Sequence, residues 1–203
     1  VDDNAAALAT YGPISSWDVS LITNMFQLFK DKVNFNDDIS NWDVSSVTTM
    51  AEMFKGGWEA ETIFNQDLSS WDVSSVTNMS SMFFCNSNFN QDLSSWDVSN
   101  VHNISWMFQS ASSFNQDISS WDVSNVENMQ SMFASAVNFN QDISSWDVSN
   151  VQNMQSIFES ANYFNQSLSI WNVSNVTNMK NMFYATWYFN QDISSWDVSS
   201  VSN

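Results

Sequence analysis

The sequence predicts an α/β solenoid of about eight coils, each formed by a short strand plus a short helix, with one parallel sheet along the stack. The first observation is a repeated motif: "SSWDVSNV" stands at residues 119–126 and again, unchanged, at 144–151. The tryptophan of this motif recurs every 25 residues, except for one interval of 29. A fixed period of this length indicates one structural unit per repeat, stacked on its neighbours. The eight tryptophans are Trp17, Trp42, Trp71, Trp96, Trp121, Trp146, Trp171 and Trp196.

The second observation is the pattern inside one unit, residues 114–138. In "ISSWDV", Trp121 and Val123 alternate with polar residues, which predicts a strand with both side chains facing inward. In "SNVENMQSMF", the apolar residues recur three or four apart, which predicts one face of a short helix. Ser124 precedes this run where an N-cap belongs. The helical run consists of Val126, Met129, Met132 and Phe133.

The third observation is that large apolar residues keep fixed positions in the repeat. All 11 Met fall into two positions and 14 of the 16 Phe into two others. Stacked coils turn such positions into continuous columns, so we expect the Met, Phe and Trp columns to form the core. An asparagine column is expected to form a hydrogen-bonded ladder between coils, because each side-chain amide both donates and accepts. It comprises Asn65, Asn90, Asn115, Asn140, Asn165 and Asn190.

The composition limits the partners. With 22 acidic and four basic residues the net charge is −18, which repels nucleic acids and anionic membranes. No apolar run approaches the roughly 18 residues of a membrane span, so no membrane insertion by this segment is expected. The single cysteine, Cys85, excludes an internal disulfide framework. With three Gly and one Pro, Asn and Ser must form most turns.

The repeats define the domain organisation. Residues 1–10 form an N-terminal flank, and residues 11–203 form one repeat domain with a four-residue insertion within 55–63. The last unit stops at "WDVSSVSN", before its helix is complete. We therefore expect an excerpt of a longer array.

The unit "FNQDISSWDVSNVENMQSMF" resembles the BspA-like leucine-rich repeat family, which is common in mycoplasma surface lipoproteins. The resemblance covers nearly the whole chain, and the spacing of its apolar residues is that of leucine-rich repeats. It implies a curved solenoid at the cell surface or outside the cell, often with a role in adhesion. The family contributes no catalytic residues.

Aspartates form two further columns, and the outer one lies between inward-facing residues of "WDVS", so it should point outward. Three interpretations of these carboxylates remain open: they accept hydrogen bonds from turn amides and Ser or Asn, they are simply solvated, or they bind Ca²⁺. Calcium is the only cofactor considered, and its candidate ligands are Asp43, Asp72, Asp97, Asp122, Asp147 and Asp197. The second column, which follows "FNQ", comprises Asp38, Asp67, Asp92, Asp117, Asp142 and Asp192.

No residue pattern indicates an enzyme. His102 is the only histidine, Cys85 has no histidine near it in the sequence, and the paired carboxylates recur in every unit rather than forming one unique constellation. Aromatic residues outside the core columns are the candidates for binding a protein or a glycan. They are Trp58, Trp106, Tyr163, Tyr184, Trp187 and Tyr188.

Three functions are compatible with these features. The first is a non-enzymatic extracellular surface module for adhesion or for binding a protein or glycan. The second is a structural spacer or assembly subunit that stacks on further copies of the repeat. The third is an ice-binding surface, in which Ser, Asn and Asp ladders order water.

Overall fold

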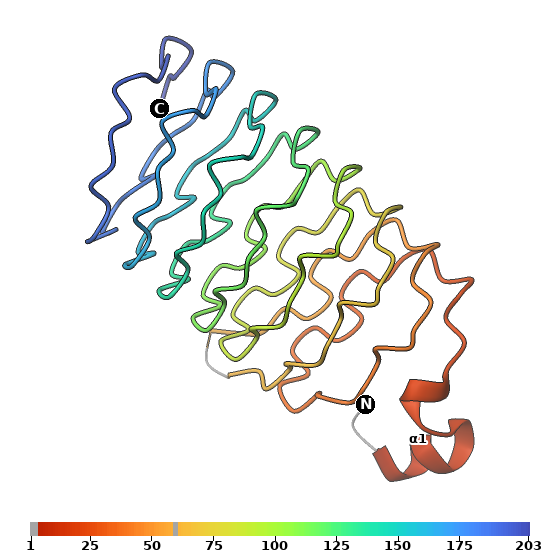
Figure 1. Cartoon of the computed structure of the whole chain (residues 1–203). Helices are drawn as coiled ribbons and strands as arrows, with labels where there is room; N and C mark the ends of the chain where they lie inside the picture. The colour runs from red at the N-terminus through yellow and green to blue at the C-terminus, as the bar shows by residue number, and fades with distance from the viewer. Residues whose placement is uncertain (1–3, 59–60) are drawn as a thin grey trace.

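The chain folds into an elongated stack of coils with its two termini at opposite ends (Figure 1). The computed structural model describes residues 4–58 and 61–203. The N-terminal end carries the helix α1, Asn4–Tyr11, followed by the 3₁₀ helix η1, Ile14–Ser16. We number the coils one to eight by their repeated tryptophan, from Trp17 to Trp196.

The expected strand and helix in every coil, and the parallel sheet, are wrong. Within the described residues, α1 and η1 are the only helices, and the pairing between coils consists of isolated parallel bridges rather than strands. One bridge residue occurs in each of coils one to seven, inside the segment for which the sequence predicts a helix. The bridges join, in order, Asn24, Thr49, Asn78, Asn103, Asn128, Asn153 and Asn178.

Left-handed residues explain why the predicted helix does not form. In coil five, Ser131 and Ser135 have φ of 53° and 57°, outside the right-handed helical region. Alternate backbone amides donate to the next coil rather than within their own. The N–H of Ser131 donates to the carbonyl of Gln155 at 2.8 Å, and that of Phe133 donates to the carbonyl of Ile157 at 2.9 Å. The intervening amides close turns within the coil. Such turns also bring apolar residues inward three or four positions apart, which is the spacing that indicated a helix.

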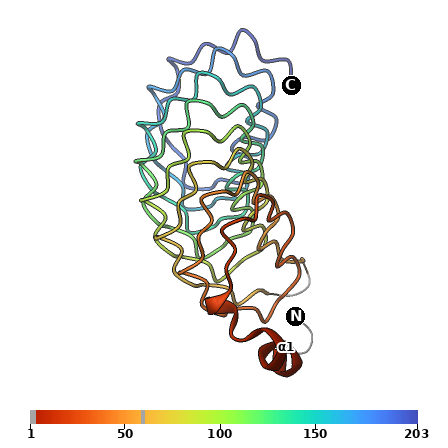
Figure 2. The same ribbon diagram turned by 90° about the vertical axis from the view of Figure 1, so that its right-hand side faces the viewer.

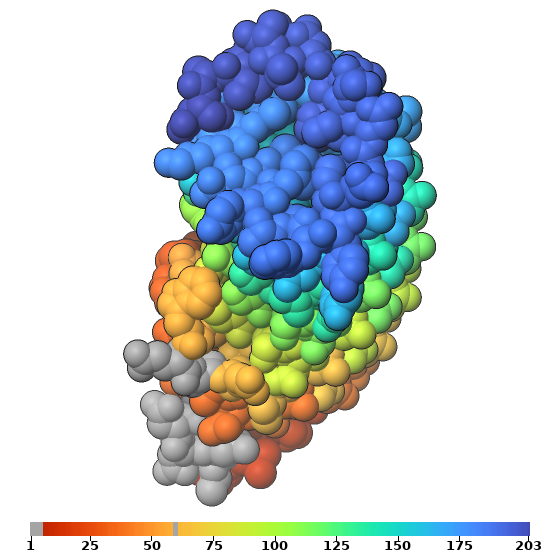
Figure 3. All heavy atoms as spheres, turned by 90° about the vertical axis from the view of Figure 1, so that its left-hand side faces the viewer, coloured from red at the N-terminus to blue at the C-terminus, as the bar shows by residue number. Residues whose placement is uncertain are grey.

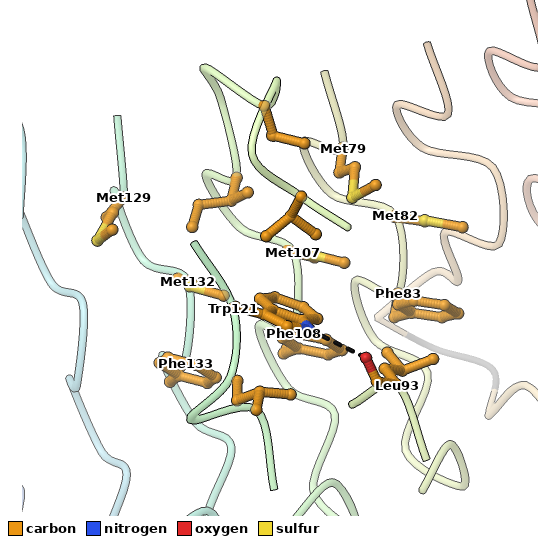
Figure 4. Close-up of a cluster of buried hydrophobic side chains, with 14 of the residues drawn as sticks. Met79, Met82, Phe83, Leu93, Met107, Phe108, Trp121, Met129, Met132 and Phe133 are labelled. Atoms are coloured by element: carbon orange, nitrogen blue, oxygen red, sulfur yellow. Dashed lines mark hydrogen bonds between the residues drawn. The ribbon is translucent and has the colours of Figure 1, made fainter. Parts of the chain in front are cut away.

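The segment predicted as a strand, "ISSWDV", joins its neighbours through side chains instead of a backbone ladder. In coil five, the indole N–H of Trp121 donates to the carbonyl of Leu93 at 3.0 Å (Figure 4). The hydroxyl of Ser120 donates to the carbonyl of Ser94 at 2.9 Å. Side-chain donors thus supply the inter-coil hydrogen bonds on this side of the stack.

The asparagine ladder is confirmed. The side-chain oxygen of Asn90 accepts the backbone N–H of Asn115 at 2.9 Å, and Asn115 does the same for Asn140. The side-chain amide of Gln116 adds a bond to the carbonyl of Asn90 at 3.0 Å. From coil two to coil eight, each coil is therefore tied to the next at the bend before the tryptophan segment.

The predicted core is confirmed for the inner coils, where the Met, Phe and Trp columns are buried. Figure 4 shows Met107 in a row with Met82 and Met132, and Phe108 in a row with Phe83 and Phe133. At the two ends of the stack the tryptophan column is less buried, since Trp17 is exposed and Trp196 is only half-buried.

Aromatic rings of successive coils stack along the core columns. The ring centroids of Phe108 and Phe133 are 5.9 Å apart, and those of Trp121 and Trp146 are 6.4 Å apart. Ring stacking therefore links these coils through the core. Figure 2 shows the stacked coils from a second direction.

Candidate binding surface

Four of the six candidate aromatic residues lie together on the turns of coils six and seven. These turns follow Phe158 and Phe183 and belong to the C-terminal part of the stack, drawn blue in Figure 3. We call these four residues the aromatic patch, and their exposed fractions are 53% for Tyr163, 65% for Tyr184, 79% for Trp187 and 61% for Tyr188.

The patch is held by contacts between the two turns. The rings of Tyr163 and Tyr188 stack with centroids 5.4 Å apart and planes 16° from parallel. The N–H of Tyr188 donates to the carbonyl of Asn162 at 3.2 Å, and that of Ser160 to the carbonyl of Tyr184 at 2.8 Å. The exposed rings therefore stand on backbone that inter-coil hydrogen bonds fix in place.

The other two candidates lie apart from the patch. Trp58 is an exposed residue in the insertion, on the turn between coils two and three, and its ring meets that of Phe84 edge-on at 4.8 Å. Trp106 is half-buried at a left-handed position of coil four, with φ of 58°. The structure does not bring either residue to the aromatic patch.

The insertion packs tightly where it joins the stack. A Cβ on Gly56 would lie 2.7 Å from the side chain of Thr62 and 3.0 Å from the carbonyl oxygen of Cys85, so only glycine fits there. The hydroxyl of Thr62 donates to the buried side chain of Asn86 at 2.7 Å. Residues 59 and 60 of the predicted insertion lie outside the described residues.

Beside the insertion, lysines surround one carboxylate. Glu52 accepts a hydrogen bond from Lys30 at 2.8 Å and another from Gln27 at 2.9 Å, and Lys55 lies 3.3 Å away. Partial burial alone would raise the pKa of Glu52, but these bonds and the charge of Lys55 outweigh it and lower the pKa to about 2. The ammonium of Lys55 also lies over the ring of Phe84, 5.0 Å from its centroid.

Both aspartate columns form side-chain-capped turns, the first of the three interpretations. All thirteen carboxylates accept the backbone N–H of the serine two residues later, at 2.8 to 3.1 Å. In Asp147 the hydroxyl and the amide of Ser149 hold the carboxyl pKa below its usual value, against a smaller effect of burial. Asn172 replaces the aspartate in coil seven and makes the same bond to Ser174.

The six aspartates proposed as calcium ligands thus each cap their own turn. Among residues 4–58 and 61–203, no group of three or more His, Cys, Asp or Glu side chains is placed to hold a metal ion. His102 is exposed, with its Nδ1 3.0 Å from the carbonyl of Asn125. Cys85 is buried, and burial raises the pKa of its thiol.

A family model matches almost the whole chain in three overlapping stretches, residues 3–116, 57–138 and 116–203. Its description is "Mycoplasma protein of unknown function, DUF285". The chain belongs to this family. The three overlapping matches agree with the repeats and place the DUF285 chain in a mycoplasma-type repeat family. No curated protein and no solved structure matches it significantly. In the part of the chain that the structure describes, no helix is long and apolar enough to cross a membrane.

Sequence reasoning missed two residues, Glu159 in the turn that carries Tyr163 and Phe84 beneath Trp58. Both share one position of the repeat with Tyr184, the position directly after the first phenylalanine of the turn. An alignment of the repeats by this position would have placed Glu159 beside Tyr184, and Lys55 beside Phe84.

Proposed function

We propose that the chain is a BspA-like surface repeat protein that acts outside the cell, where it mediates adhesion by binding a protein or glycan through the aromatic patch. The observation that carries this proposal is the gathering of four largely exposed rings on two neighbouring turns. In the inner coils the aromatic columns are buried, so these rings are not needed to fill the core.

The physical argument is one of preorganisation. A ring that is mostly exposed gains little from folding, yet it can bury a large apolar area against a partner at a small cost in conformational entropy. Tyrosine and tryptophan are the residue types that dominate binding energy at interfaces. Because the two turns are hydrogen-bonded to each other, little ordering is needed on binding.

The proposed role is non-enzymatic. It is supported by the chain's acidic residues, most of which recur at equivalent positions and cap turns coil after coil. A catalytic site needs one constellation with distinct roles, whereas these carboxylates share one local role.

The test measures binding of the purified chain to host-type cell surfaces and to arrays of glycans and extracellular proteins. The variant carries Tyr163→Ser, Tyr184→Ser, Trp187→Ser and Tyr188→Ser, and the matched control carries Trp58→Ser, which removes an equally exposed ring elsewhere. We expect the fourfold variant to lose binding and the control to keep it, with both melting near the parent temperature. Binding that survives the fourfold change would contradict the proposal and favour a spacer role.

A further inference from the structure

One position of the repeat carries different chemistry in different coils. It follows the first phenylalanine of each turn, and successive coils place its residues side by side on the same edge of the stack. From coil one to coil seven its residues are Lys30, Lys55, Phe84, Gln109, Ala134, Glu159 and Tyr184. An aromatic ring occurs here twice, once beside a lysine and once beside a glutamate.

In coils two and three the aromatic ring at this position, that of Phe84, already has the ammonium group of Lys55 over its face. The ammonium of Lys55 lies 5.0 Å from the centroid of Phe84, and Trp58 covers the ring edge-on. Phe84 is consequently only 8% exposed. A cation over an aromatic face is attracted by the negative potential of the ring.

In coils six and seven the equivalent ring, that of Tyr184, has no cation over it among the described residues. Tyr184 is 65% exposed, and the neighbour that corresponds to Lys55 is Glu159, a carboxylate. Lys180 belongs to the same coil, but among the described residues its side chain makes no contact with a ring. The position therefore combines an uncovered aromatic face with an adjacent anion.

We propose that Tyr184 and Glu159 bind a lysine or arginine side chain of a basic segment in a partner protein, as Lys55 binds Phe84 within the chain. The inference rests on the proposed function and specifies the partner for the aromatic patch. The incoming cation lies over the ring of Tyr184 and beside the carboxylate of Glu159. The neighbouring rings of Tyr163, Trp187 and Tyr188 contact the residues that flank it.

The charge of the whole chain favours the same partner. The net charge is −18, and three of the four lysines lie in coils one and two, at the other end of the stack. A negative surface speeds the approach of a basic segment, while stacking on exposed rings makes the binding local to the patch. Charge alone would bind a polycation anywhere on the stack, so the test must separate the two effects.

The probe is a blocked peptide in which three lysines alternate with glycine, and its control is the same peptide with every lysine acetylated. Dissociation constants are measured at physiological ionic strength by NMR titration. We expect the lysine peptide to bind and the acetylated peptide to bind at least about fivefold more weakly, because acetylation keeps the length but removes the cation. Tyr184→Phe should stay within about twofold of the parent, since the ring is kept, whereas Tyr184→Ala should weaken binding about fivefold.

Glu159→Lys is the most informative variant, because it places a lysine beside Tyr184 in the way that Lys55 lies beside Phe84. We expect it to abolish binding of the lysine peptide. Glu127→Lys makes the same change in net charge at an exposed site outside the turns, and it should weaken binding no more than about twofold. Melting curves check that each variant remains folded.

Equal binding of the lysine and acetylated peptides, unchanged binding by Tyr184→Ala, or equal losses in Glu159→Lys and Glu127→Lys would each overturn the inference. If a glycan or a neutral protein then bound in a patch-dependent way, the proposed function would stand without a cationic partner. Cell binding that does not depend on the patch would instead remove the proposed function itself.

Discussion

Individual residues of this chain act mainly as turn formers and inter-coil donors. Asp147 caps its turn by accepting a hydrogen bond from the backbone N–H of Ser149 at 3.0 Å. The side-chain oxygen of Asn115 accepts the backbone N–H of Asn140 in the next coil. Asn, Asp and Ser thus do what glycine does in most turn-rich proteins, because their short polar side chains bond to nearby backbone. Carboxylates in neighbouring coils repel one another, yet the bonds from serine still lower the pKa of Asp72 and Asp97.

Acid should destabilise the fold. Lowered carboxyl pKa values in the folded state, as for Asp97 and Asp147, mean that the unfolded chain takes up protons first, near the ordinary Asp pKa of about 3.9. The contribution of these groups is therefore present above that value and is lost as pH falls through the folded values. We expect Tm to decrease from about pH 5 to pH 2 at constant ionic strength, measured by circular dichroism. A Tm that rises on acidification would show that repulsion along the columns dominates.

Trp121 should be among the most costly residues to truncate. It is 3% exposed, stacks between Trp96 and Trp146, and donates to the carbonyl of Leu93. Trp121→Ala should reduce the free energy of unfolding by about 3–5 kcal/mol in urea denaturation. Trp121→Phe keeps a ring but loses the hydrogen bond, and it should cost less than the alanine variant. A loss under about 0.5 kcal/mol for alanine would place the column outside the core.

At the scale of the element, each coil is a succession of turns rather than a helix and a strand. In coil one and in coils three to seven the bridged segment carries two non-glycine residues with positive φ, such as Ser131 and Ser135 in coil five, whereas coil two has only Glu52. A left-handed residue with a Cβ costs about 1–2 kcal/mol, and the inter-coil bonds of the same residues to Gln155 and Glu159, at 2.8 and 2.7 Å, offset this cost.

Glycine should therefore stabilise the coil at a left-handed position such as Ser135 and destabilise it at positions without positive φ. Ser135→Gly removes the strain at φ of 57°, and we expect a gain of up to about 1 kcal/mol in the free energy of unfolding. The matched control is Ser124→Gly, at a position without positive φ, where the entropy of glycine should cost about 0.5–1 kcal/mol. Equal effects at the two sites would contradict the left-handed assignment.

At the scale of the whole molecule, hydrogen bonds couple the stability of each coil to that of its neighbours. Inter-coil bonds join residues 22 to 32 apart, as in the pairs Lys30 with Glu52 and Trp71 with Ile39. Stability in such a stack is approximately a sum of coil terms and nearest-neighbour terms.

Removal of one complete unit should preserve the fold. Deletion of residues 114–138 joins Ser113 to Phe139 and keeps every column in register. We expect the shortened chain to give the parent circular dichroism spectrum and a modestly lower Tm. Deletion of half a unit, residues 114–125, shifts the columns against one another and should abolish cooperative unfolding. Similar melting of the two deletions would argue against columnar packing.

The sequence by itself determined the period, the columns and their burial. These features depend on residue type at fixed spacing, as with Trp121 and Phe133, and stacking follows from the period alone. The role of the aspartates was one of three open interpretations, and hydrogen bonds such as that from the Ser149 amide to Asp147 decided it. That Tyr163 joins Tyr184, Trp187 and Tyr188 was not predicted, because its turn meets theirs only when neighbouring coils are stacked. The equivalent positions of Glu159 and Tyr184 in successive coils were also missed, although an alignment of the repeats shows them.

Only the tertiary structure decided the path of the backbone. Apolar residues three or four apart, such as Met129, Met132 and Phe133, fit a helix and a series of turns equally well. The choice between them depends on where the amide of Ser131 finds its acceptor. That acceptor is the carbonyl of Gln155, one coil away. Helices and strands are predicted from the spacing of apolar residues within a segment, and a hydrogen bond between coils does not change that spacing.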